Sequence, residues 1–275
     1  MRCRRPSPYG STLKKASLWG AFFIGALIGA PLVLGAECPL LPGGQEVTVR
    51  QVVDGDTLRL ADGRAVRLIG VNAPELGKSG GTPQPYAETA RRRLKELVAA
   101  SDERLRLVPG SEETDHYGRT LAHLYDRQDS NLEARLIAEG LGYAVAIAPN
   151  TRLAACQAAA ERQARRAGLG IWKQDPTIAA TRVEEGGFAV VQGRLREVER
   201  NRGGLWLQLE GDLVVNVPDR FVDAFDEVPL QQWIGRDLEV RGWISDRNRR
   251  REPGRARWQM TLNDPHMLGL RVESF

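Results

Sequence analysis

The chain has 275 residues, a length that allows two modest domains. Its 42% hydrophobic and 27% charged residues are typical of a soluble globular protein rather than a fibrous or disordered one. The formal net charge is +4, but the first 36 residues hold five positive charges and no acidic residue. Subtracting those five leaves about −1 for the rest, so net charge gives no argument for nucleic-acid binding.

The first 36 residues are expected to be an export signal. Arginines and lysines come first, and an apolar run rich in Leu, Ile, Phe, Gly and Ala follows at residues 16–36. This is the layout of a secretory leader, and cleavage after Ala36 would leave a periplasmic or secreted protein. The alternative is an uncleaved membrane anchor, because the run is nearly long enough to span a bilayer.

Two cysteines remain after such a leader, Cys38 and Cys156. An even number in an oxidising compartment suggests a disulfide that ties the mature N-terminus to a helix. Two unrelated thiols are the alternative, and the sequence favours neither.

Residues 46–174 are expected to form one domain. Alternating apolar residues predict strands at 47–53, 57–60, 65–71, 104–108 and 121–125. Asp62-Gly63 is a tight-turn signal between the second and third of these. Helical spacing predicts helices at 86–100 and 131–139, and a third that Thr151 caps and that runs to about 167. Five short strands with a helix after the third are typical of an OB-type five-stranded barrel, here with three helices.

A linker is expected at residues 175–187, which contain Pro176 and the Gly186-Gly187 pair. Residues 188–270 then show strand periodicity and predict a second, smaller OB-like β-barrel domain. Its strands are expected at 188–198, 205–209, 213–217, 237–244 and 258–262, with a short helix at 219–225. The fold class is therefore mainly β with α, of the α+β type.

Polar residues gather in the hairpin after Val52, namely Asp54, Asp56, Arg67, Asn72 and Glu75. Cleavage of a phosphodiester requires that the negative charge on the phosphoryl oxygens is neutralised and that a water is positioned for attack. A hard cation held by oxygen ligands and the planar fork of an arginine can neutralise this charge. A nearby carboxylate can orient the water and accept its proton. Taken alone, Asp54 and Asp56 would more often be turn residues. Asn72 before Pro74 is also a common turn signal, and Arg67 could be a solvated strand residue.

Three motifs in order distinguish these readings. They are Asp54-Gly55-Asp56-Thr57, the run Arg67-Leu68-Ile69-Gly70-Val71-Asn72-Ala73-Pro74-Glu75, and Asp115-His116-Tyr117-Gly118-Arg119. Together they resemble the staphylococcal (micrococcal) nuclease family, also called thermonucleases, over about residues 47–173. The resemblance implies an OB-type barrel and a nuclease that binds one Ca²⁺ ion.

The resemblance also implies a role for each matching residue. Asp56, Asn72 and the backbone carbonyl of Ala73 match metal ligands. Arg67 and Arg119 match catalytic arginines that bind the phosphate, and Glu75 matches a carboxylate proposed as general base. Tyr117 matches a tyrosine near the bound phosphate. His116 precedes it in the arginine motif and is the second expected substrate-binding residue, with a solvated turn residue as the favoured alternative.

Two positions depart from the family pattern. Asn72 stands where the founding nuclease has Asp, so weaker binding of a hard divalent cation is expected. Val145 and Ile147 stand where that nuclease has tyrosines, so part of a base-stacking surface is lost.

A candidate nucleic-acid patch lies near the C-terminus, at Arg247, Arg249, Arg250 and Arg251. Trp243 and Trp258 flank it, and arginines beside aromatic rings suit single-stranded nucleic acid. Arginine is abundant throughout this chain and tryptophans on strands usually belong to a core, so a structural role is the alternative.

The sequence thus predicts an exported, calcium-dependent nuclease acting on DNA, RNA or both. The expected partner is nucleic acid, with no small-molecule cofactor, a monomeric state, and membrane contact only if the leader is retained. The alternatives are a catalytically weak or inactive nucleic-acid-binding protein of the cell envelope and an envelope scaffold without activity.

Overall fold

The computed structural model describes residues 38–77, 81–247 and 256–271. The expected leader lies outside the described residues, as do Arg249, Arg250 and Arg251 of the candidate patch. No helix in the described ranges is long and apolar enough to cross a membrane.

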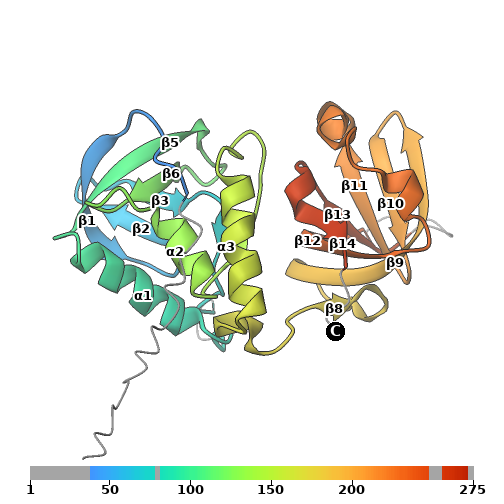
Figure 1. The fold of residues 1–275 in the computed structure, drawn as a ribbon, viewed down its shortest axis with the longest axis horizontal. Helices are drawn as coiled ribbons and strands as arrows, with labels where there is room; N and C mark the ends of the chain where they lie inside the picture. The colour runs from blue at the N-terminus through green and yellow to red at the C-terminus, as the bar shows by residue number, and fades with distance from the viewer. Residues whose placement is uncertain (1–37, 78–80, 248–255, 272–275) are drawn as a thin grey trace, which may run out of the picture. The chain divides into compact units, whose positions relative to one another are not determined.

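The first barrel is a closed sheet in the order β1-β2-β3-β6-β5 (Figure 1). Its strands are β1 (Gln45–Val52), β2 (Thr57–Leu60), β3 (Ala65–Leu68), β5 (Arg104–Thr114) and β6 (Thr120–Tyr125). The β3–β6 pairing is parallel and closes the barrel, whereas the other pairings are antiparallel. Alternate residues such as Leu58, Leu60, Val66 and Leu68 face inward and are almost completely buried.

Three helices belong to this half of the chain: α1 (Ala87–Ala99), α2 (Leu132–Ala138) and α3 (Ala154–Arg166). α1 buries Ala87, Ala90, Leu94, Leu97 and Val98, the helical spacing that its sequence predicts. Asn131 caps α2, because its side chain accepts a hydrogen bond from the N–H of Ala134.

The expectation that Thr151 caps α3 is wrong. The helix begins at Ala154, and its N-cap residue, Leu153, makes no side-chain cap. Thr151 instead contributes its carbonyl, which accepts from the N–H of Ala154 in the turn before the helix. The 3-10 turn η1 (Gly170–Lys173) follows α3 and buries Ile171 and Trp172.

A two-stranded ladder lies outside the barrel sheet. β4 (Val71–Asn72) pairs antiparallel with β7 (Tyr143–Ala144), which places Asn72 opposite Tyr143. The chain between β3 and β4 passes over α3, where the side-chain amide of Gln157 donates to the carbonyl of Ile69 at 3.2 Å. A Cβ at Gly70 would collide with Gln157, so this close approach requires glycine.

The second barrel contains β9 (Gly187–Asn201), β10 (Gly204–Leu209), β11 (Leu213–Pro218), β12 (Asp237–Asp246) and β13 (Trp258–Thr261). The sheet runs β12-β13-β11-β10-β9, and an additional β12–β9 pairing closes it. β14 (Leu268–Leu270) and β8 (Ile178–Ala179) extend its edges. β8 lies within the expected linker, where two residues pair parallel with β9.

Short 3-10 turns connect these strands: η2 (Ala180–Arg182), η3 (Asp219–Phe225), η4 (Leu230–Trp233) and η6 (Pro265–Met267). η3 occupies the range in which the sequence predicts a short helix. The expected α+β fold, an OB-type barrel followed by a second barrel, is confirmed.

Both barrels lie within one compact unit of the chain. Arg241 of β12, which is 9% exposed, donates to Glu161 of α3 at 2.5 Å and to Glu239 at 2.6 Å. Arg165 of α3 makes two further hydrogen bonds to Glu239, each 2.8 Å long. Since buried charges require partners, these four residues hold α3 against β12 as a single ionic network.

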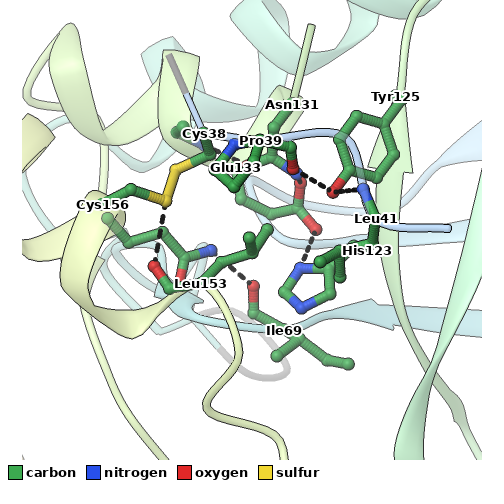
Figure 2. The surroundings of a disulfide bond; sticks show 12 residues. Cys38, Pro39, Leu41, Ile69, His123, Tyr125, Asn131, Glu133, Leu153 and Cys156 are labelled. Atoms are coloured by element: carbon green, nitrogen blue, oxygen red, sulfur yellow. Dashed lines mark hydrogen bonds and ion pairs between the residues drawn. A yellow bond between two sulfur atoms is a disulfide. The ribbon is translucent and has the colours of Figure 1, made fainter. Parts of the chain in front are cut away.

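The N-terminal end of the described chain is held at two points (Figure 2). Cys38 and Cys156 of α3 form a disulfide with Cα atoms 5.4 Å apart. The buried Tyr125 hydroxyl donates to the carbonyl of Pro39 and accepts from the N–H of Leu41. The structure therefore pairs the two cysteines, the arrangement that ties this segment to a helix.

Candidate active site

Gly55 allows the Asp54-Gly55-Asp56 turn to lie close to α1 and to the strand end at Ala73. A Cβ added at Gly55 would lie 2.5 Å from the Cβ of Ala73 and 2.7 Å from that of Ala90. Because real Cβ atoms do not approach so closely, glycine is required between the two aspartates. The turn thereby brings the carboxylate of Asp56 within hydrogen-bonding reach of Ala73, whose N–H donates to Oδ2 at 2.8 Å.

Arg67 joins the two expected side-chain metal ligands. Its Nη2 lies 3.1 Å from Oδ2 of Asp56 and donates to Oδ1 of Asn72, also at 3.1 Å. Its Nη1 donates to the carbonyls of Leu68 and Val71 at 2.8 and 2.7 Å. The guanidinium is thus fixed on both branches and holds the oxygens of Asp56 and Asn72 around one point.

Asp54 lies against the same cluster, although it is not one of the residues to which the resemblance gives a role. Its Oδ1 accepts from the N–H of Asp56 at 3.0 Å. Burial, followed by repulsion from the Asp56 carboxylate, raises the pKa of Asp54 from 3.8 to about 6. The turn therefore concentrates negative charge, which favours a nearby cation.

Glu75 follows β4 and is exposed. Its N–H donates to Oε1 of Gln84, and the N–H of Gln84 donates back to its carbonyl, both at 2.8 Å. This reciprocal pair holds the backbone of Glu75 beside that of Gln84. Within the described part of the chain, the Glu75 carboxylate has no hydrogen bond or ion pair. The Glu75 backbone is therefore held in place by Gln84, whereas its carboxylate is free to interact with a ligand.

Asp115 orients Arg119. Oδ2 of Asp115 accepts from Nε of Arg119 at 2.7 Å, and Oδ1 accepts from the backbone N–H groups of Tyr117 and Arg119, each at 2.9 Å. Gly118 has a φ of 76° and closes the turn, in a conformation that glycine adopts readily. Both Nη groups of Arg119 remain without a protein acceptor among the described residues.

Tyr117 and His116 extend from this turn. Tyr117 is 73% exposed, the guanidinium of Arg119 lies 5.4 Å from its ring centre, and the His116 ring is 3.8 Å away. The parallel β3–β6 register places Arg67 opposite Leu121, two residues after Arg119. The structure thus brings Asp56, Arg67, Asn72 and Ala73 into direct contact, and it places the Arg119 turn on the strand beside Arg67.

The sequence interpretation missed two residues that shape this site. Asp115 belongs to the arginine motif. An aspartate at the start of a glycine turn, four residues before an arginine, could have been predicted to accept hydrogen bonds within that turn. Gln84 lies in a loop without periodicity, so nothing local identifies it as the partner of Glu75. The tyrosine replacements differ in exposure: Val145 is buried, whereas Ile147 is 45% exposed.

The donor set fits a hard divalent cation only in part. Asp56, Asn72 and the adjacent Asp54 supply the carboxylate and amide oxygens that calcium prefers. In the described ranges, no three His, Cys, Asp or Glu side chains come together as a metal-binding group. A cation here would therefore depend on few charged ligands and on amide or backbone oxygens.

The candidate patch in the second barrel is described only at Arg247. Its guanidinium lies 5.6 Å from the Trp206 ring centre. Arg257 stacks on Trp258 at 4.4 Å and pairs with Asp246 at 2.9 Å, so it is engaged within the protein. Trp258 is buried, as in the structural alternative, whereas Trp243 is 43% exposed.

Comparison with known proteins adds an independent line of evidence. A family model described as staphylococcal nuclease homologue matches residues 65–174. A thermonuclease of Staphylococcus intermedius is 35% identical over 134 residues, which cover 48% of this chain and 78% of that protein. Endonuclease YncB of Bacillus subtilis (strain 168) is 34% identical over 132 residues, 46% of this chain and 62% of the relative.

A third relative, the SPbeta prophage-derived endonuclease YokF of the same Bacillus strain, is 34% identical over 134 residues, 47% of this chain and 45% of its own length. By their names these relatives are nucleases, the hydrolase class that the three motifs predict. The family model runs from β3 to the end of η1 and so covers Arg67, Asn72 and Arg119, whereas Asp56 precedes the matched range. The chain therefore belongs to the staphylococcal nuclease family.

Proposed function

We propose that this protein is an exported, calcium-dependent nuclease that hydrolyses phosphodiester bonds of DNA, RNA or both. The observation that carries the proposal is the contact of Arg67 with both Asp56 and Asn72. This contact gathers two oxygen ligands and one guanidinium at the edge of the first barrel. It is the combination that a phosphoryl-transfer site requires.

The two arginines have different tasks in this proposal. Arg119 is held through Nε, so both of its Nη groups can donate to the phosphoryl oxygens as charge builds in the transition state. Arg67 already uses both Nη groups within the protein, so it acts chiefly by placing the ligand oxygens and by its positive charge. Glu75, with a free carboxylate, orients the attacking water and accepts its proton.

A divalent cation bound by Asp56, Asn72 and the carbonyl of Ala73 would supply positive charge at the phosphate and polarise it. The family is metal-dependent, and calcium is proposed because the donors are hard oxygens. Asn72 removes one negative charge from this set, which an exported protein in a calcium-rich medium tolerates. The disulfide supports export, because such bonds persist in oxidising compartments.

The test is cleavage of single-stranded DNA, double-stranded DNA and RNA by the protein from residue 37 onward. Reactions contain calcium, magnesium or a chelator. Arg67→Gln is compared with Arg64→Gln, a control in the same hairpin whose guanidinium forms an exposed pair with Asp62. We expect calcium-dependent cleavage that Arg64→Gln retains and Arg67→Gln loses by on the order of 100-fold or more.

Two outcomes oppose the proposal. Cleavage that persists in chelator would reject the metal, and absence of cleavage in every condition would reject the enzyme. Polynucleotide binding without cleavage would instead identify the protein as a binding module of the cell envelope.

A further inference from the structure

A cavity of about 710 Å³ lies between α3 and the strands β12 and β14 of the second barrel. None of Asp56, Arg67, Glu75 and Arg119 lines it, so it is separate from the candidate active site. Arginine is its commonest charged lining residue. The five are Arg162, Arg165, Arg166, Arg241 and Arg271.

Three buried donors at this cavity have no hydrogen-bond partner. They are Nε of Arg165, Nε1 of Trp172 and Nη1 of Arg271. They make up three of the five unpartnered buried side-chain atoms among the described residues. An unpaired buried donor is destabilising, because folding removes its hydrogen bond to water and supplies no replacement. All three atoms are donors, so the groups that would satisfy them are acceptor oxygens.

Carboxylates balance the positive charge of only some of the arginines at the cavity. Arg241 and Arg165 are paired with Glu161 and Glu239, and Arg271 is paired with Asp175 at 3.0 Å.

Arg162 and Arg166 differ from these three arginines. They are exposed, lie four residues apart on one face of α3, and form no ion pair or hydrogen bond within the described ranges. Two like charges that remain unpaired on one helix face repel each other and attract an anion.

A series of side-chain and backbone contacts runs from the cavity to the candidate active site. The guanidinium of Arg165 stacks on Trp172, 3.9 Å from the ring centre. The Tyr143 ring meets Trp172 edge-on at 5.5 Å, and the backbone of Tyr143 pairs with that of Asn72. Two aromatic residues therefore span the path from the strand that bears a proposed metal ligand to the arginine-lined cavity.

We propose that this cavity and the adjacent arginines of α3 bind phosphate groups. A phosphate carries negative charge and several acceptor oxygens, and arginine meets two of them at once. The polynucleotide strand that flanks the scissile bond supplies these phosphates, and this source rests on the proposed function. Free phosphate offers the same chemistry, so the experiment separates the two sources.

The test compares two double variants with the unmodified protein. Arg162→Gln/Arg166→Gln removes the unpaired arginines, and glutamine preserves helix propensity. Arg92→Gln/Arg202→Gln is the matched control, because both residues are exposed, do not line this cavity and lose the same charge. Point variants are preferable to removal of the second barrel, which would leave Glu161, 3% exposed, without Arg241.

Binding of a long single-stranded oligonucleotide is measured by fluorescence anisotropy in chelator, over a range of salt concentrations. We expect the α3 variant to bind on the order of tenfold more weakly than the control at low salt. The slope of log affinity against log salt should fall by about 1.4, because each phosphate contact to a single strand contributes about 0.7. A purely structural role of the arginines would leave that slope unchanged.

Calorimetry with inorganic phosphate is the second measurement. If the α3 variant loses phosphate binding while both variants bind the oligonucleotide equally well, the site exists and its ligand is a free anion. The proposal is overturned if the two double variants have equal affinity for the oligonucleotide and equal affinity for inorganic phosphate. Trp172→Phe, which removes one unpartnered donor while keeping a ring beneath Arg165, should weaken whichever probe binds.

Cleavage of the same oligonucleotide by the unmodified protein with calcium is followed separately. Its absence would reject the proposed nuclease, while the binding data, collected in chelator, would still decide whether the cavity takes phosphate. The two failures are therefore distinguishable.

Discussion

Arg119 and Asp115 are joined twice, once through the side chain at 2.7 Å and once through the backbone N–H at 2.9 Å. Burial alone would raise the pKa of Asp115, but the hydrogen bonds from Arg119 and Tyr117 outweigh it and hold that pKa below its ordinary value. The carboxylate stays charged and fixes the guanidinium in one orientation. Asp62 and Arg64 repeat the arrangement at 2.8 and 3.0 Å in an exposed hairpin.

Asp115→Asn should lower kcat on cleavage by roughly 10- to 100-fold, because a misplaced catalytic group costs about that much. The amide retains Oδ1 for the turn but replaces the oxygen that accepts from Nε of Arg119. Steady-state kinetics with a fluorogenic oligonucleotide measures the change. Asp62→Asn is the matched control and should leave kcat unaltered; equal effects of both changes would rule out an orienting role for Asp115.

Asn72→Asp should tighten calcium binding by on the order of tenfold, since an added carboxylate strengthens a hard-cation site. The new carboxylate would still face Nη2 of Arg67, which now donates to the amide oxygen. Isothermal titration calorimetry gives the affinity directly. An equal or weaker affinity would remove Asn72 from the set of ligands.

Asp54 makes the metal-free protein sensitive to pH. Its pKa is about 6 in the folded protein and 3.8 without burial and Asp56, so folding favours its protonated form. Its stabilising contribution is complete below about pH 4 and is lost as the pH rises through about 6.

Asp54→Asn retains the acceptor for the N–H of Asp56 and removes the carboxylate. We expect this variant to exceed the wild type by about 2 kcal/mol in free energy of unfolding at about pH 7, with little difference near pH 4. Urea denaturation in chelator measures both. A difference that is equal at both pH values would show that the raised pKa is not the cause.

The disulfide should contribute to stability rather than to catalysis. It closes a loop with a sequence separation of 118 residues, so loss of the bond is expected to cost about 2–5 kcal/mol. Denaturant unfolding of Cys38→Ser/Cys156→Ser measures the cost, and kcat of the folded variant should be unchanged. Thiol titration of the unfolded, unreduced protein from residue 37 onward should find no free thiol, and two free thiols would contradict the bond.

Glu161 and Arg241 should be strongly coupled energetically. Glu161 accepts from Arg241 through one carboxylate oxygen and from the N–H of Ala144 through the other. Arg241→Met leaves the buried Glu161 carboxylate without this partner and should cost about 3–5 kcal/mol, whereas adding Glu161→Gln should cost less than the sum of the single changes.

The exposed pair Arg104 and Glu46, 3.8 Å apart, provides the control for this cycle and should show a coupling near zero. Thermal or urea unfolding supplies all the values. Additive effects at Glu161 and Arg241 would show that the network does not hold α3 against β12.

Periodicity predicted most of the secondary structure, because each element of the barrels buries one face. β2, β10 and the buried face of α1 coincide closely with the pattern of their own residues. The pattern did not predict that β5 extends to Thr114, where exposed residues pair only because β6 lies beside them. β8 was missed for the same reason, since two residues form a strand only when β9 offers an edge.

The barrel, the family and the candidate site residues could be predicted from the sequence, because they depend on local spacing and on the order of three motifs. Which side chains meet could be learned only from the folded structure. Arg67 bonds Asp56 across a hairpin, Arg241 bonds Glu161 across 80 residues, and the arginine-lined cavity takes its residues from α3, η1, β12 and the chain after β14. Such contacts depend on packing between elements, which no local pattern encodes.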